Sequence, residues 1–130
     1  MMNSHRELAL ALLASAALLG CGSPPTPGYV AHVQAAGKAT RQGGYGAAAL
    51  EYERAAAVAG SPHDAEEARY RAASSYARAG ELAHARALYS ELARAALNVE
   101  LRARADFALA EIEQQPETAE ALRVAAMRRH

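Results

Sequence analysis

Apolar residues are distributed in two different ways along the chain. Residues 8–19 form one run that is apolar except for Ser15 and has no polar face. From about Tyr29 onward, alanine, leucine, valine and tyrosine instead recur at helical spacing among arginine and glutamate. This spacing collects the apolar side chains on one face of each amphipathic helix. The pattern therefore predicts a short apolar leader followed by a series of packed helices.

Helix-breaking residues divide the second region into about six predicted helices. The first helix is expected at about Val30 to Arg41, with Gly37 as an interruption, and Gly43-Gly44 is interpreted as its stop. Gly60-Ser61-Pro62 breaks the helix that follows. Consecutive helices joined by such short breaks are expected to pack as hairpins.

The remaining helices are delimited in the same way. Asp64 with Glu67 has the spacing of a capping box and is expected to open the third helix. Residues 101–113 are expected to form another helix, whose apolar stripe consists of Leu101, Ala105, Ala108, Leu109 and Ile112. A turn at Gln114-Gln115-Pro116 then separates it from a last helix at Ala119 to Arg128.

Composition favours the same fold class. More than a quarter of the residues are alanine, the strongest helix former, whereas aromatic residues make up 5% and tryptophan is absent. A length of 130 residues suits one small domain, and a hydrophobic fraction of 52% excludes disorder over most of it. Lys+Arg and Asp+Glu are both 14, which argues against a nucleic-acid-binding protein, since such a protein needs a basic face. We therefore expect an all-α protein that binds no nucleic acid.

The apolar run ends at the only cysteine of the chain. The run spans about 12 residues, which is too short to cross about 30 Å of hydrocarbon but suits the core of a secretory signal. Leu18-Leu19-Gly20-Cys21 follows directly and resembles the lipobox of bacterial lipoproteins. The resemblance implies that residues 1–20 are a cleaved signal peptide and that the Cys21 thiol carries a diacylglyceryl group. The alternative is an ordinary signal peptide with an incidental cysteine.

A lipid on Cys21 would attach the mature protein to a membrane without a transmembrane helix, because two or more acyl chains give stable anchoring. Residues 21–28 then form the lipidated cysteine and a short tether, since Gly22 to Gly28 is rich in proline and glycine. The resemblance also implies the outer membrane, facing the periplasm, in an organism with two membranes, because Gly22 rather than aspartate follows the cysteine.

Two segments of the helical region repeat about 37 residues apart. The first contains Gly43, Tyr45, Ala48, Tyr52 and Ala55, and the second contains Gly80, Leu82, Ala85, Tyr89 and Leu92 at the same spacing. This pattern resembles the tetratricopeptide repeat (TPR), in which glycine ends the first helix of a hairpin and small and aromatic residues follow along the second. The tryptophan position of that family falls on Arg69, with Tyr70 as the nearest substitute.

The TPR resemblance implies a short α-solenoid of about three helix-turn-helix hairpins in residues 29–130. Its units are expected at about 29–62, 66–99 and 100–130. A helical bundle without true repeat geometry is the alternative.

In arrays of this kind the first helix of each hairpin lines a concave groove. The TPR groove positions fall on Arg41, Glu67, Tyr70, Ser74, Arg78 and Arg104, with Val33 and Ala108 as apolar members of the set. Tyrosine and arginine are frequent anchors of binding interfaces. We therefore expect the groove to take an extended or helical peptide of acidic character.

The sequence contains no arrangement typical of an enzyme. Its five histidines are scattered, with no two of them three or four positions apart, so we expect no metal site. Ser74-Ser75 has no histidine or aspartate at a suggestive position, and Glu66-Glu67 and Glu111/Glu113 are interpreted as helix starts and solvated faces. We expect no catalytic residue, no cofactor besides the covalent lipid, and no small-molecule substrate.

These expectations combine into a leading functional hypothesis and two alternatives. The leading hypothesis is a lipid-anchored, non-enzymatic scaffold or adaptor that binds another protein or peptide of the bacterial cell envelope. The first alternative is a structural accessory subunit of an envelope assembly or secretion complex, which packs through the ends of its helical array. The second is a lipoprotein enzyme or metal binder.

Overall fold

The computed structural model of the protein describes residues 22–115, 124, 127 and 128. These residues form α2 (Pro27–Arg41), α3 (Tyr45–Ala57), α4 (Pro62–Arg78), α5 (Leu82–Ala95) and α6 (Val99–Gln114). The fold is all-α, as the composition predicts, and the described part of the chain contains no strand. None of the described helices is both long enough and apolar enough to span a bilayer.

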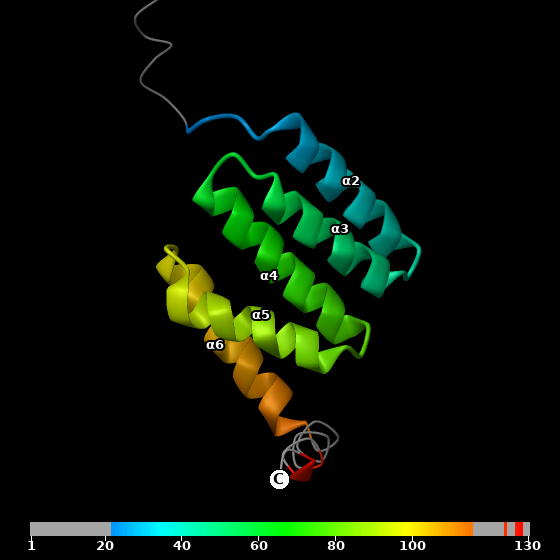
Figure 1. Ribbon diagram of the computed structural model, residues 1–130, viewed down its shortest axis with the longest axis vertical. Coiled ribbons are helices and arrows are strands. Elements are labelled where there is room, and N and C mark those ends of the chain that lie inside the picture. Colours follow the sequence, from blue (N-terminus) through cyan, green and yellow to red (C-terminus); the bar gives the residue numbers. More distant parts are fainter. Residues whose placement is uncertain (1–21, 116–123, 125–126, 129–130) are drawn as a thin grey trace, which may run out of the picture.

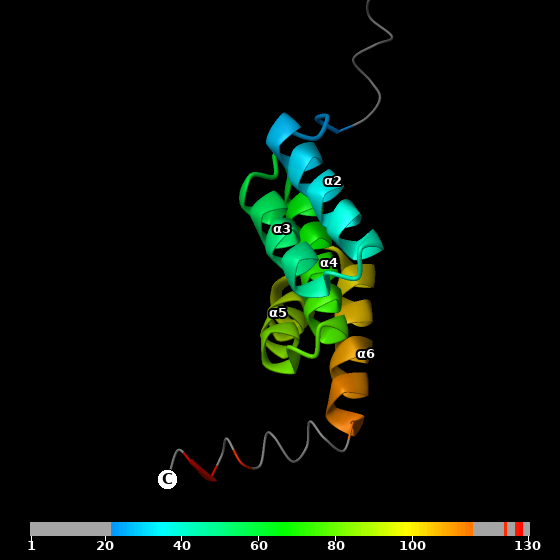
Figure 2. The same cartoon turned by 90° about the vertical axis from the view of Figure 1, so that its right-hand side faces the viewer.

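The helices stack in two layers. Each helix runs antiparallel to the one before it and packs against it (Figure 1). Figure 2 shows α3 and α5 on one side and α2, α4 and α6 on the other, and α4 also contacts α6 directly. The start of α2, the α3–α4 loop and the α5–α6 loop consequently share one edge of the stack, while the α2–α3 and α4–α5 turns share the opposite edge.

Two glycines form the turns at that opposite edge. Gly43 follows α2 with φ of +76°, and Gly80 follows α4 with φ of +80°. Both angles lie in the left-handed region, which costs a glycine little because it has no Cβ. The predicted glycine stops are therefore confirmed, and the 37-residue correspondence between the two turns extends to their backbone conformation.

The beginning of α2 differs from the sequence prediction. The helix begins at Pro27 rather than at about Val30, because the Thr26 hydroxyl accepts a hydrogen bond from the Tyr29 backbone N–H at 3.2 Å and Pro27 suits the first helical turn. The irregular segment after residue 21 therefore ends at Thr26, not at Gly28. The prediction that Gly37 interrupts the helix is also wrong, since α2 continues through it to Arg41.

The predicted capping box at the start of α4 is wrong as well. Ser61 is the N-cap, and its hydroxyl accepts a hydrogen bond from the Asp64 backbone N–H at 3.2 Å. α3 has already ended at Ala57, and Pro62 begins the new helix, since its fixed φ suits the first helical turn. Glu67 instead faces Arg71, one turn further along α4.

The last described helix agrees closely with its prediction. Asn98 caps α6 by accepting hydrogen bonds from the backbone N–H groups of Glu100 and Leu101. The helix ends at Gln114, inside the predicted turn. The expected final helix at Ala119 to Arg128 lies outside the described residues except for residues 124, 127 and 128, and the predicted signal peptide and Cys21 lie outside them too.

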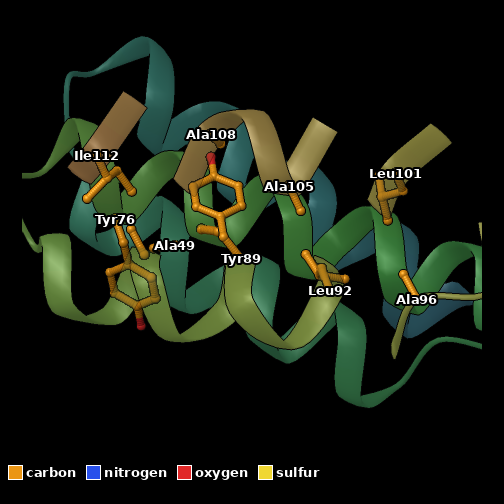
Figure 3. Packing of buried hydrophobic residues seen from close by; sticks show 11 residues of the cluster. Ala49, Tyr76, Tyr89, Leu92, Ala96, Leu101, Ala105, Ala108 and Ile112 are labelled. Atoms are coloured by element: carbon orange, nitrogen blue, oxygen red, sulfur yellow. The ribbon is translucent and has the colours of Figure 1, made fainter. Parts of the chain in front are cut away.

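The main core lies between α3, α4, α5 and α6 (Figure 3). Its larger members are Tyr76, Tyr89, Leu92, Leu101 and Ile112, and alanines fill the remaining positions. The apolar stripe predicted for α6 is confirmed, with four members buried and Leu109 packed at the margin of the cluster. Close approach through alanine therefore joins these helices, with a few large side chains filling the space between them.

A second, smaller cluster joins the first helices of the stack. Its buried members are Ala55, Ala56 and Ala68, against which Tyr29 and Val33 pack with part of their surface. No fully buried member is larger than alanine, so this end of the described stack removes less apolar surface from water.

Candidate functional site

A groove with a volume of about 290 Å³ runs along α4. Its lining residues are Thr40, Tyr52, Glu67, Tyr70, Arg71, Ser74, Ser75, Arg78 and Arg104. Six of them lie on α4 three or four positions apart, which places them on one face of that helix. The helices α2, α3 and α6 each contribute one further side chain, so the groove is formed only when the helices are packed.

The structure brings together five of the six residues predicted for the groove, namely Glu67, Tyr70, Ser74, Arg78 and Arg104. Arg41 is not among the lining residues, and its neighbour Thr40 takes that place. A Cβ at Gly37 would lie 3.5 Å from Nη1 of Arg41, so the arginine side chain extends back along α2.

Two apolar residues assigned to the groove by the TPR resemblance do not line it. Val33 packs against the small alanine cluster, and Ala108 is buried in the main core. Helix packing buries Ala108 and part of Val33, so neither side chain contributes to the groove lining.

Arg78 is held in place at one end of the groove by Tyr45. Its guanidinium carbon lies 4.1 Å from the centroid of the Tyr45 ring, and Nη2 donates a hydrogen bond to the Tyr45 hydroxyl at 2.8 Å. Tyr45 begins α3, directly after the Gly43-Gly44 turn. The turn that closes the first hairpin therefore positions an arginine of the second one.

Arg104 is supported by a stack of two tyrosines. Its guanidinium carbon lies 4.3 Å from the centroid of the Tyr70 ring, and Tyr70 meets the ring of Tyr89 edge-on at 5.4 Å. Tyr89 is buried in the main core. Burial is the main cause that raises the pKa of its phenol, and the electrostatic effect of the neighbouring Tyr70 is the next. This stack connects the groove surface directly to the core.

The groove carries an excess of positive charge. Arg71 donates a hydrogen bond from Nε to Glu67 Oε1 at 3.0 Å, and this bond raises the pKa of the Arg71 guanidinium. Among the ion pairs of the described residues, neither Arg78 nor Arg104 has a carboxylate partner. Three arginines therefore face one carboxylate, and two of the three retain donors for an anionic ligand.

One buried carboxylate, Glu66, has a role that its position in the sequence does not predict. Glu66 is buried, whereas it was expected at a solvated helix start. Its Oε1 accepts a hydrogen bond from the Leu97 backbone N–H at 2.6 Å, and its Oε2 accepts one from the Asn98 N–H at 3.2 Å. The partners are backbone groups of the α5–α6 loop, so no residue type in the sequence indicates the pairing.

A second polar contact lies outside the groove-lining residues. Tyr76 donates a hydrogen bond to Glu53 Oε2 at 2.5 Å, and its ring stacks on His84 with centroids 5.0 Å apart. Burial and the adjacent Glu53 carboxylate together raise the pKa of the Tyr76 phenol to about 12.

Among the described residues, no three histidine, cysteine, aspartate or glutamate side chains gather as a metal-binding group.

Comparisons with known proteins do not assign the chain to a family. No protein-family model, no curated protein sequence and no solved structure matches it.

Proposed function

We propose that the protein is a lipid-anchored, non-enzymatic scaffold of the bacterial cell envelope whose groove binds an acidic segment of another envelope protein. The observation that carries this proposal is the placement of Arg78 and Arg104 over tyrosine rings beside one groove. An arginine held on an aromatic ring has lost much of its side-chain freedom before a ligand arrives. Binding a carboxylate there costs less entropy than binding it to a free arginine.

The dimensions of the groove suit a short peptide segment. From Glu67 to Arg78 the helix advances about 16 Å, at roughly 1.5 Å per residue. An extended peptide covers that length with about five residues, at roughly 3.3 Å each. Alternate side chains of such a peptide point the same way, so two acidic residues on one side would face Arg78 and Arg104.

We also propose that the described helices are part of a TPR-like solenoid. Support comes from the two equivalent left-handed glycines, Gly43 and Gly80, and from the fully buried alanines Ala48 and Ala85 at equivalent places in the two hairpins. The placement of α2, α4 and α6 in one layer, with the groove along the middle one, agrees with that geometry. A helical bundle does not require this correspondence between hairpins.

The lipid anchor rests on the lipobox resemblance at Leu18 to Cys21. Two measurements test the lipid anchor. One is membrane fractionation of the wild-type protein and of Cys21→Ala, and the other is the mass of the mature N-terminus. The wild type is expected in the outer-membrane fraction, starting at a lipidated Cys21. A soluble wild type whose mature chain carries an unmodified Cys21 would contradict the anchor and leave the groove proposal open.

Peptide binding tests the groove separately. An acidic peptide with aspartate at alternate positions is compared with the same peptide carrying asparagine, using fluorescence anisotropy on the full mature protein. We expect the asparagine peptide to bind at least about tenfold more weakly, because charge-assisted hydrogen bonds are the stronger ones. The double variant Arg78→Ala/Arg104→Ala should lose this preference.

The matched control is Arg94→Ala on α5, which removes an exposed arginine that does not line the groove. It should leave the affinity for the acidic peptide unchanged. Equal weakening by Arg94→Ala and by Arg78→Ala or Arg104→Ala alone would mean that net charge alone attracts the peptide, and the groove proposal would fail.

One observation favours the alternative of a structural accessory subunit. Phe107 on α6 is 67% exposed, which leaves a large apolar side chain at the end of the described stack. If a larger complex covers it, Phe107→Ser should weaken co-purification of the complex while peptide binding in the groove stays intact. If only the groove variants lose the partner, the scaffold function is the better description.

A further inference from the structure

Four exposed apolar side chains lie along one edge of the stack. They are Val30 at 40% exposed, Val58 at 43%, Leu97 at 74% and Val99 at 68%. Val30 lies in the first turn of α2, Val58 follows α3, and Leu97 and Val99 flank the start of α6, so all four belong to the edge shared by these connections (Figure 1). We call this edge of the stack, with its four exposed apolar residues, the loop edge.

The chain that precedes α2 leaves the fold at the same edge. The Thr26 hydroxyl donates a hydrogen bond to the Val58 carbonyl oxygen at 2.8 Å. A Cβ at Gly28 would lie 3.4 Å from Cγ2 of Val58, so the first turn of α2 also packs closely against this residue. The direction from which the chain enters α2 is therefore fixed by contacts with the α3–α4 loop.

The distance from Cys21 to this edge is limited by chain length. Only residues 22–26 separate Cys21 from the first residue of α2. Fully extended, the six Cα-to-Cα steps from Cys21 to Pro27 reach at most about 22 Å, at roughly 3.6 Å each. A lipid on Cys21 would therefore hold the loop edge close to the bilayer surface.

We propose that the loop edge lies against the lipid surface in which Cys21 is anchored. This inference rests on the proposed lipidation and adds an orientation to it. Because α4 starts at the loop edge and ends at the opposite edge, the groove would extend away from the membrane, with its Glu67 end nearer the lipid and its Arg78 end farther out. A partner would then bind along the direction of the membrane normal.

Apolar contact rather than charge would hold the edge on the lipid. The last turns of α3 and α5 bring Arg54 and Arg94 to this edge, and the first turns of α4 and α6 bring Asp64 and Glu100. With the buried Glu66 carboxylate hydrogen-bonded to the α5–α6 loop, the edge carries no excess of positive charge, so a long-range attraction to anionic headgroups is small. The contact should therefore persist at high salt.

The experiment uses the full lipidated protein in vesicles of phosphatidylethanolamine and phosphatidylglycerol. An environment-sensitive fluorophore is attached to Leu97→Cys at the loop edge, or to Ala83→Cys as the matched control, because Ala83 is exposed in the first turn of α5 at the opposite edge. Lipids that carry a nitroxide quencher report how close each label lies to the bilayer. Circular dichroism checks that both variants keep the helical content of the wild type.

We expect the quencher to reduce fluorescence at position 97 at least about threefold more than at position 83, in low and in high salt. Equal quenching at both positions in vesicle-bound protein would overturn the proposed orientation while leaving the anchor intact. Labelling of Cys21 itself, in protein that does not float with the vesicles, would overturn the anchor and the orientation together. The peptide-binding test of the groove is independent of both results.

Discussion

At the scale of single residues, Tyr89 connects the core with the groove. Its side chain is 4% exposed within the main core, and its ring supports Tyr70 beneath Arg104. Tyr89→Ala is expected to cost roughly 3–5 kcal/mol, because removing a buried aromatic ring leaves a cavity that neighbours fill only in part. Tyr89→Phe, which keeps the ring, should cost far less, and urea denaturation compares the two. A cost below about 1 kcal/mol for Tyr89→Ala would contradict the proposed repeat register.

Because of Tyr76, the free energy of unfolding is expected to change with pH in the alkaline range. The pKa of its phenol is raised from 10.0 to about 12 by burial and by the hydrogen bond to Glu53. Between these values the folded state binds the phenolic proton more tightly than the unfolded state does. The contribution of Tyr76 is therefore complete below pH 10 and is lost as the pH rises through about 12.

Urea midpoints measured from pH 9 to pH 12 test this dependence. The wild-type midpoint should fall across the range, and that of Tyr76→Phe should fall less steeply, because phenylalanine has no proton to lose. The pKa values of Tyr29 and Tyr89 are raised as well, so some slope remains in the variant. Parallel curves for both proteins would show that Tyr76 is not the titrating group.

At the scale of helices and loops, Glu66 joins the beginning of α4 to the α5–α6 loop. Glu66→Ala is expected to cost about 1–3 kcal/mol, because the backbone N–H groups of Leu97 and Asn98 lose their acceptor. The matched control is Glu67→Ala, which removes a partly exposed ion pair with Arg71 worth about 0.5 kcal/mol or less. Equal losses of unfolding free energy for the two variants would mean that the buried contact adds nothing.

Replacing Gly37 or Gly80 with alanine should change the stability of the protein in opposite directions. Gly37 lies inside α2, and the nearest atom to an added Cβ is the mobile end of Arg41, so Gly37→Ala is expected to stabilise by about 0.5–1 kcal/mol. Gly80 has φ of +80°, where a Cβ is strained, so Gly80→Ala is expected to destabilise by about 1–2 kcal/mol. Thermal denaturation measures both changes. A loss of stability in Gly37→Ala would mean that α2 depends on glycine at that position.

Local patterns along the chain predict much of this architecture, and contacts between distant segments account for the rest. Helical spacing on α4 was enough to place Glu67, Tyr70, Ser74 and Arg78 on one face, because side chains three or four positions apart always lie together. The Arg41 side chain turns back along α2 toward Gly37 and does not line the groove, and no periodicity encodes this side-chain direction. The role of Glu66 depends on backbone groups that only folding brings near it.

The two N-caps were missed for a different reason. Thr26 and Ser61 each precede a proline, and proline was interpreted as a helix breaker or part of a tether. Proline breaks a helix interior because it lacks an N–H and its ring clashes with the preceding turn, whereas in the first turn that N–H needs no partner and the fixed φ is helical. A hydroxyl residue directly before the proline is the local signal that distinguishes a helix start from a helix end.

At the scale of the whole molecule, the two described ends of the stack differ in how much core they bury. In α2 only Ala36 is fully buried, and the cluster beneath the helix contains no buried side chain larger than alanine. In α6 four residues are buried, among them Leu101 and Ile112. In stacked helical arrays, stability is roughly a sum of local terms, so segments with weak interfaces open first.

Native-state hydrogen exchange of the full protein tests this difference. Peptides from α2 are expected to exchange about tenfold faster or more than peptides from α4, because opening α2 exposes less apolar surface. Peptides from α6 serve as the control for position in the stack, since α6 is the last described helix but has a larger core. If α6 is protected like α4, core size decides which end opens. If α2 and α6 exchange equally fast, position at the end of the stack governs opening, and the small alanine cluster does not weaken α2.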